Sequence, residues 1–449
     1  MAKHMVAFRQ PEDRVQVMTT QAVLVRHLAT FDGERQLRNA LFLATCLLCW
    51  FTVAPFSDLS DPQLLAPKAE GDLLGQVATV LLTGALAVFV FVKRSSLVLR
   101  TVTLPLVLTF GAFAVSAVLS AHPDVASRRI VLAMFTIFQA SVLLLLPYGR
   151  EHFARLLAAV AVIVLAACYF GVALLPQFSI HQLNDVTEPA LAGDWRGFFT
   201  HKNGAGAGMA LLIFIGIFVY RASNKLIGTL IIIFAAVFLY FTQAKSPLNL
   251  LPIVLLLSYV VPRVRSSSLA LVLILGTPIL INLLTVGSVV FEPVRELISR
   301  FMSDPTFTGR DEIWRFALDN VAKRPLFGFG FEAFWGMPDL VNAWSYQESW
   351  GYRASDAHNG YLNLAVTTGL VGLALSLCWI ILQPFADHRR AQSLNADGAL
   401  RTLFLQIWMM GLCLSGFESE LFRGGSALWF LTVASIVGIR LMTIAQNRE

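Results

Sequence analysis

Long runs of apolar residues, separated by short polar segments, fill the chain from about position 39 to position 443. A helix that spans a bilayer needs roughly 17–25 mostly apolar residues, and most of the runs approach this length. The predicted spans are 39–56, 73–92, 102–119, 130–146, 153–175, 204–220, 226–242, 247–261, 269–289, 358–382, 402–415 and 427–443. This alternation predicts an all-α polytopic membrane protein with about 12 transmembrane helices.

The spacing of the runs also predicts the domain organisation. The segments are a cytoplasmic N-terminal segment (1–38), spans one to nine (39–289), one long folded loop (290–357), spans ten to twelve (358–443) and a cytoplasmic tail (444–449). No apolar stretch lies near Met1, so no cleavable signal peptide is expected. The long loop is rich in aromatic residues, unlike disordered segments. We therefore expect it to fold, with a short helix near Asp311–Ala322 followed by Gly/Phe turns.

Charge alternates along the short loops. One set of loops is basic and holds Lys93, Arg94, Arg100, Arg150, Arg155, Arg221, Lys225, Arg263, Arg265, Arg389, Arg390 and Arg401. The other set is acidic and holds Asp58, Asp61, Glu70, Asp72, Asp185, Glu188, Asp194, Glu418 and Glu420. Because basic loops stay in the cytoplasm, both termini are predicted to be cytoplasmic and the long loop exterior.

Composition supports a membrane protein and argues against several other classes. Of the 449 residues, 56% are hydrophobic and 14% are charged, against about a quarter charged in soluble domains. The net charge of +6 follows from the basic loops, so no nucleic-acid partner is predicted. The cysteines lie in apolar runs, as packing residues do. No metal-ligand spacing, phosphate-cradling glycine loop or nucleophile elbow is present, so neither a metal nor a cofactor is predicted.

A histidine marks the point where the long loop meets the tenth apolar run, in Ala357-His358-Asn359-Gly360-Tyr361. A histidine at a membrane boundary can accept a proton near neutral pH. In the alternative interpretation, His358 and Asn359 only hydrogen-bond the first helical turn. Asp356 lies two residues earlier and could orient or charge the ring, which favours a functional role.

Cations are predicted on the same face. Arg196 either anchors the interface beside Trp195 or offers a fork of donors to a phosphate. His201, Lys202 and Asn203 follow it, and Asn203 could cap the next helix.

Two further cations lie in predicted exterior loops. Lys245, in a short hairpin, either snorkels or faces the same cavity as Arg196. Arg310 either forms a local ion pair with Asp311 or Glu312 or contributes to the same site. Ile313 and Trp314 give its segment an apolar face that could lie against the membrane.

At these residues the chain resembles the O-antigen ligase and polymerase superfamily of bacterial membrane glycosyltransferases. The resemblance rests on Arg-Gly-x-Phe-x-His-Lys-Asn at Arg196–Asn203, Thr-Gly-Arg-x-x-Ile-Trp at Thr308–Trp314, and Pro325-Leu326-Phe327-Gly328-Phe329-Gly330 followed by His358-Asn359-Gly360-Tyr361. Within the superfamily, the His-Lys-Asn and Thr-Gly-Arg-x-x-Ile-Trp motifs look closest to those of exopolysaccharide polymerase-type members. The hairpin Ala244-Lys245-Ser246-Pro247 keeps the family's cation but not its surrounding hydroxyls, which puts a hydroxyl role there in doubt.

The resemblance implies a C-type glycosyltransferase-like fold and a metal-independent, inverting transfer from a polyprenyl-diphosphate-linked oligosaccharide. It implies that Arg196, Lys245 and Arg310 bind the diphosphate and that His358 is the general base, with Arg196 and Arg310 counted among the catalytic residues. The further candidate substrate-binding residues are His201, Lys202, Asn203, Trp314, Asn359 and Glu418. The aromatic residues of the long loop are expected to stack on sugars.

The predicted function is polymerisation of lipid-linked repeat units into exopolysaccharide at the periplasmic face of the bacterial inner membrane. The expected partners are the donor, a glycan or lipid-linked glycan acceptor, the bilayer and a chain-length regulator. A ligase that transfers the glycan to lipid A–core or to a protein stays open, because it differs in acceptor and not in catalysis. A transporter or flippase would need ionisable residues within spans or two matching halves, and the sequence has almost none of these.

Overall fold

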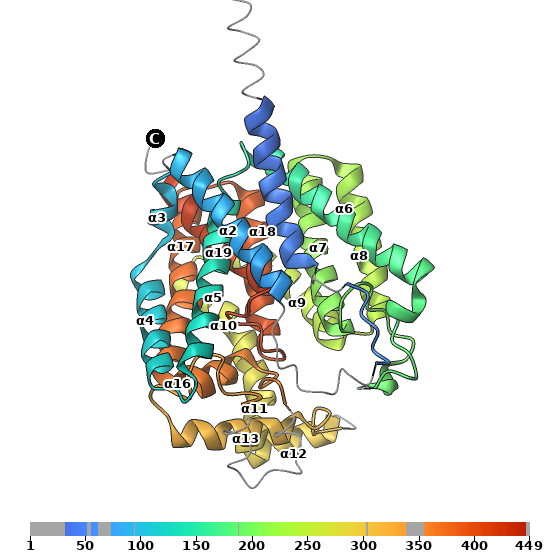
Figure 1. Cartoon of the computed structure of the whole chain (residues 1–449), viewed down its shortest axis with the longest axis vertical. Coiled ribbons are helices and arrows are strands. Elements are labelled where there is room, and N and C mark those ends of the chain that lie inside the picture. Colours follow the sequence, from blue (N-terminus) through green and yellow to red (C-terminus); the bar gives the residue numbers. More distant parts are fainter. Residues whose placement is uncertain are drawn as a thin grey trace, which may run out of the picture.

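The computed structural model describes residues 32–51, 55–61, 73–93, 95–186, 188–301, 304–337 and 354–445. Each predicted span corresponds to a helix in this part of the chain (Figure 1). The helices are residues 32–50, α2 (Leu73–Lys93), α4 (Leu104–Val118), α5 (Pro123–Leu143), α6 (Arg150–Leu174), α7 (Lys202–Ala222), α8 (Lys225–Thr242), α9 (Lys245–Val260), α10 (Ser267–Leu284), α16 (Gly360–Leu377) continued by α17 (Gln383–Ser393), α18 (Gly398–Leu414) and α19 (Ala427–Ala445).

Within the described residues, nine helices are long and apolar enough to cross a membrane, and α4 and α18 are shorter apolar helices. The same residues contain no strand, only an isolated bridge between Ile180 and Trp195. The prediction of an all-α polytopic membrane protein is confirmed.

Burial separates inner helices from outer ones. In α7 and α19, 78% and 72% of the most apolar window is buried inside the protein, against 17% in α2. On the outer helices large side chains such as Leu81, Phe91 and Val272 are exposed. Apolar side chains that are exposed in this number need a lipid environment, so this is a multi-pass membrane protein.

Contacts between loops divide the bundle into two ends. At one end Arg150 pairs with Asp397 at 2.9 Å, and Arg389 donates to the main chain at Val264 and Arg265. All of these residues lie in or beside loops predicted to be cytoplasmic. At the other end, called here the site end, the loops predicted to be exterior meet. The grouping of the loops agrees with the predicted topology, and the side of the membrane that each end faces stays a prediction.

The long loop lies across the site end (Figure 1). Helix α11 (Val286–Val290) ends the apolar run before the loop, and the loop itself contains α12 (Glu292–Phe301) and α13 (Arg310–Lys323). The last of these confirms the short helix predicted near Asp311–Ala322. Trp314, Phe316, Phe329 and Phe334 form a separate hydrophobic cluster there.

The expectation that the loop aromatics stack on sugars is wrong for this cluster. A loop that lies across a helix bundle needs buried apolar contacts to stay folded, and these rings supply them by packing with Leu362 and Val366 of α16. Trp314, for example, is 1% exposed. Trp344, Tyr346, Trp350 and Tyr352 lie outside the described residues.

Helix α16 is interrupted at Gly369, where φ is +69° and ψ is −179°. The segment 325–330 of the long loop fills the interruption. The hydrogen bonds run from Phe329 N to Val366 O (3.1 Å), from Gly330 N to Thr367 O (2.8 Å), from Leu370 N to Pro325 O (2.7 Å) and from Val371 N to Leu326 O (3.3 Å). A broken helix is tolerated at membrane depth when neighbouring protein satisfies the freed backbone groups, which is what this segment does.

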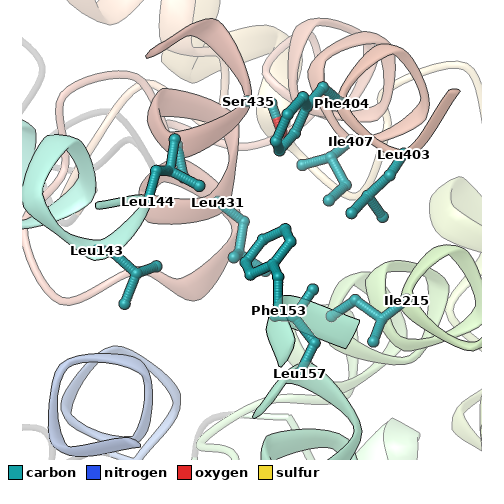
Figure 2. A pocket seen from close by; sticks show the side chains of 11 residues that line it. Leu143, Leu144, Phe153, Leu157, Ile215, Leu403, Phe404, Ile407, Leu431 and Ser435 are labelled. Atoms are coloured by element: carbon teal, nitrogen blue, oxygen red, sulfur yellow. The ribbon is translucent and has the colours of Figure 1, made fainter. Parts of the chain in front are cut away.

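An apolar recess lies between α5, α6, α7, α18 and α19, away from the site end (Figure 2). Its lining is Leu143, Leu144, Phe153, Leu157, Ile215, Leu403, Phe404, Ile407, Leu431, Ala434 and Ser435. Ser435 contributes the only hydroxyl to this wall, and no ionisable side chain lines it. The recess therefore holds no group suited to acid–base or phosphate chemistry.

Candidate active site

At the site end, the carboxylate of Glu418 contacts side chains from three other elements. It comes from the loop between α18 and α19. Its Oε1 accepts from Asn203 Nδ2 at 3.0 Å and from Arg310 Nη2 at 3.3 Å, and its Oε2 lies 3.4 Å from His358 Nδ1. Asn203 is in the first turn of α7, Arg310 is the first residue of α13, and His358 lies just before α16. Four separate elements therefore meet at one side chain.

Glu418 is ionised at any pH at which such a membrane protein functions. Burial alone would raise the pKa of its carboxyl group. The hydrogen bond with His358 and the charges of Arg310, His358 and His201 more than offset this and lower the pKa to about 2. The site therefore contains a fixed negative charge that holds a cation and a histidine together.

His358 is held in a strained backbone conformation with φ of +46°. Left-handed φ values are uncommon for non-glycine residues and recur at functional sites. Asp356 Oδ1 accepts the His358 main-chain N–H at 2.8 Å and lies 3.9 Å from Nδ1. Both neighbouring carboxylates thus face Nδ1. The side chain is 33% exposed.

Asn359 is a structural residue in this geometry. It is fully buried and caps α16, where its Oδ1 accepts from Leu362 N at 3.0 Å. Its Nδ2 donates to Asn282 Oδ1 and Gly416 O. These bonds use both amide protons, so the predicted contact with substrate is not supported. The alternative interpretation, a residue that fastens the helix start, fits Asn359 but not His358.

The start of α7 differs from the prediction. The helix begins at Lys202 and is capped by His201, whose Nδ1 accepts from Asn203 N at 3.0 Å. A cap by Asn203 is therefore wrong, because its side chain points to Glu418 instead. Lys202 Nζ pairs with Asp194 at 2.6 Å. His201 Nε2 lies 2.7 Å from Glu188, to which it donates because its other nitrogen is an acceptor.

Beneath this turn lies a buried histidine–aspartate pair that the sequence interpretation missed. His181 Nδ1 is 2.8 Å from Asp185 Oδ2, and both side chains are at most 3% exposed. His181 Nε2 accepts from Lys202 N at 3.4 Å, so the ring is neutral. Burial lowers the pKa of His181, and its hydrogen bond to Asp185 offsets only part of this. The i, i+4 spacing of a His and an Asp was the one available signal.

Arg196 lies inside the protein and not on its surface. It is fully buried, with Nη1 donating to Phe199 O at 3.0 Å and Nη2 to Ser57 O at 2.8 Å. Burial lowers the pKa of Arg196, and the charges of Asp185 and Asp58 act against this. In this structure the fork of donors ties two loops together through these two carbonyls.

Lys245 is exposed at the first position of α9. Its hairpin packs on α7 beside Gly206, where an added Cβ would lie 2.5 Å from the side chain of Ala244. Gly206 is one turn beyond Asn203. The Lys245 end of α9 therefore lies near the group formed by Glu418, Asn203, Arg310 and His358, called here the Glu418 cluster. Among the described residues Lys245 forms no ion pair, so its charge is not already neutralised.

Comparison with known proteins agrees with this picture. Residues 197–377 match the family model described as O-antigen ligase. The exopolysaccharide production protein ExoQ of Rhizobium meliloti (strain 1021) is 30% identical over 112 residues. This stretch is 24% of the present chain and 25% of that protein, so the match spans about a quarter of the relative's length. Both matches place the similarity in the O-antigen ligase superfamily. The predicted resemblance to the O-antigen ligase superfamily is confirmed.

The segment that matches the family model includes Lys245, Arg310 and His358 and ends before Glu418. Residues from outside the matched segment therefore complete the site. Trp314 lies within it, but its Nε1 donates to Ala357 O at 3.1 Å and its ring is buried. It supports the peptide just before His358, and its predicted contact with substrate stays a prediction.

Among the residues that the structure describes, no group of three or more His, Cys, Asp or Glu side chains is placed to hold a metal ion. Metal independence itself stays a prediction. Three helix N-termini, those of α7, α13 and α16, approach the Glu418 cluster. Each carries a partial positive charge, which favours an anionic group nearby.

Proposed function

We propose that this protein polymerises polyprenyl-diphosphate-linked oligosaccharide repeat units into exopolysaccharide at the outer face of the bacterial inner membrane. The observation that carries the proposal is the convergence of Arg310 and His358 on Glu418. A cation for a leaving diphosphate and a base for an attacking hydroxyl then lie side by side. The match to the O-antigen ligase family model and the similarity to ExoQ support this class of glycosyl transfer.

In the proposed reaction an acceptor hydroxyl attacks the anomeric carbon of the donor glycan. The new C–O bond forms as the bond from that carbon to the diphosphate oxygen breaks, and the leaving oxygen takes the electron pair. His358 accepts the hydroxyl proton, which is typically worth 10²–10⁴-fold in rate. Direct displacement inverts the anomeric centre.

The leaving diphosphate gains negative charge, which Arg310 and Lys245 would offset. Lys202 is held by Asp194 and would add a weaker contribution. Arg196 is proposed to act indirectly, by fixing the loop that precedes α7. Because the cations supply the charge that a divalent ion would otherwise provide, EDTA should leave the purified enzyme active.

A polymerase and a ligase differ in the acceptor. The glycan that accumulates in a deletion strain distinguishes them. A deletion strain should accumulate a single lipid-linked repeat unit if the protein is a polymerase. A long lipid-linked chain would instead identify a ligase. Either result keeps the proposed donor, whereas normal surface polysaccharide in the deletion strain would remove the protein from this process.

The catalytic assignment is tested by His358→Gln. Glutamine keeps hydrogen bonding but cannot act as a base. Turnover should fall by roughly 10²-fold or more, while protein yield and donor binding stay near those of the wild type. Near-normal turnover in this variant, at matched protein level, would remove His358 from the mechanism.

A further inference from the structure

We propose that Glu418 is a positioning residue for the general base: it fixes the His358 ring with Nε2 free for the acceptor hydroxyl and ties that ring to Arg310. This inference rests on the proposed function. The sequence analysis made Glu418 a substrate-binding residue, but the geometry gives it contacts to protein groups on three different elements.

The tautomer of His358 follows from its neighbours. Nδ1 lies 3.4 Å from Glu418 Oε2 and 3.9 Å from Asp356 Oδ1. An ionised carboxylate can only accept hydrogen bonds, so Nδ1 carries the proton in the neutral ring. The lone pair is then on Nε2, which points away from both carboxylates. A carboxylate plays the same part in hydrolase triads, where it fixes the tautomer and stabilises the imidazolium.

Glu418 is better placed for this role than Asp356. Asp356 uses Oδ1 for the His358 main-chain N–H, and its Oδ2 lies 3.4 Å from Arg423. Its nearest approach to the ring is also longer. Glu418, in contrast, comes from a different element and binds the ring and Arg310 with its two oxygens. It therefore sets the position of the base relative to the cation.

The charges that face His358 are nearly balanced. Glu418 and Asp356 are the neighbouring acids. Arg310 neutralises part of the first, and Arg423 part of the second. Glu420 and His201 lie farther out and act on Glu418 through charge alone. Removing the Glu418 charge would leave Asp356 opposed by two arginines, which disfavours the imidazolium form.

The test compares Glu418→Gln with the wild type in purified enzyme that is supplied with lipid-linked repeat unit. The turnover number should fall by roughly 10²-fold or more, because a neutral amide no longer fixes the tautomer. The acid limb of the pH–rate profile should move to lower pH, because a carboxylate that faces Nδ1 is replaced by a neutral amide. The donor KM should stay nearly unchanged, because the substitution leaves Arg310 and Lys245 in place.

Glu151→Gln is the matched control, because Glu151 is an exposed carboxylate at the opposite end of the bundle. It should leave rate and pH profile unchanged. A purely structural role for Glu418 would lower the rate without moving the acid limb. That result, or an unchanged rate, would overturn the proposal while His358→Gln remained inactive. If His358→Gln keeps its turnover, the proposed function itself fails, and the two failures are thereby distinguished.

A second measurement needs no folded Glu418 variant. In wild-type protein labelled with ¹⁵N-histidine, the His358 signals are assigned by their loss in His358→Gln. They should report the tautomer with the proton on Nδ1. The Nε2–H tautomer would contradict the proposed geometry.

Discussion

Arg196 and Arg310 illustrate how differently two similar side chains are used. Arg196 is enclosed and donates to two main-chain carbonyls, at Ser57 and Phe199. Arg310 is 23% exposed, donates to Phe417 O and reaches Glu418. A buried cation of this kind is retained for the carbonyls that it satisfies. Arg310, which is partly exposed, has donors left for an anion.

Conservative substitution should therefore separate the two arginines. In Arg196→Lys one ammonium cannot reach both carbonyls, and an unsatisfied buried carbonyl costs about 1–3 kcal/mol. The melting temperature and the yield should fall. In Arg310→Lys both should stay near the wild-type values, while turnover falls roughly tenfold, because a charged hydrogen bond is worth about 1.5–3 kcal/mol.

Arg295→Lys, on an exposed part of α12, serves as the matched control for both variants and should be neutral. Melting of detergent-purified protein and turnover are measured for all three. Full stability together with lost turnover in Arg196→Lys would restore a direct role for Arg196 at the diphosphate.

The interrupted helix α16 explains why the glycine-rich segment 325–330 belongs to the site although none of its side chains reacts. The half of α16 that follows His358 ends at Gly369, and this segment closes the gap by main-chain hydrogen bonds. The backbone of segment 325–330 and the backbone of α16 approach so closely that no side chain fits between them. An added Cβ would lie 2.5 Å from Val366 O at Gly328 and 2.2 Å from Leu326 O at Gly369.

Gly328→Ala and Gly369→Ala should each lower the melting temperature strongly and reduce the yield of folded protein. Steric contact and a positive φ both oppose the added methyl group. Gly84→Ala in α2 is the control, since nothing lies within 4 Å of its added Cβ; it should be neutral or slightly stabilising. Wild-type melting of Gly369→Ala would mean that the segment does not pair with α16 in this way.

The molecule as a whole has two chemically distinct ends. Basic loops meet at one end, and at the other the loops bearing Arg196, Arg310, His358 and Glu418 meet. This arrangement is required if a lipid-linked donor is to react on one side of the membrane only. It also agrees with the alternating charge of the short loops.

Cysteine labelling tests the orientation. Ser345→Cys should react with a membrane-impermeant maleimide from the periplasmic side, and Ser393→Cys only after the inner membrane is opened. The native cysteines that the structure describes are buried or half-buried, so the background should be low. Labelling of both positions from the same side would contradict the topology.

Much of this organisation could be predicted from local sequence. The number and order of the helices follow from the apolar runs, because partition into lipid depends on the composition of each segment. The short helix α13 could be predicted within the long loop. The end of the bundle that carries the site follows from the alternating charge of the loops. His358 could be singled out for the same reason, since it lies where a polar segment meets an apolar one.

Contacts between distant segments decided the rest. Glu418 lies 215, 108 and 60 residues from its partners Asn203, Arg310 and His358. The sequence analysis gave Glu418 as a substrate-binding candidate, but nothing local connects it with His358 and Arg310. The burial of Arg196, the neutral His181 and the aromatic core of the long loop are likewise set by which elements pack together. Hydropathy acts on each segment separately, whereas the alignment of a base with a cation requires a geometry that exists only once the elements have met.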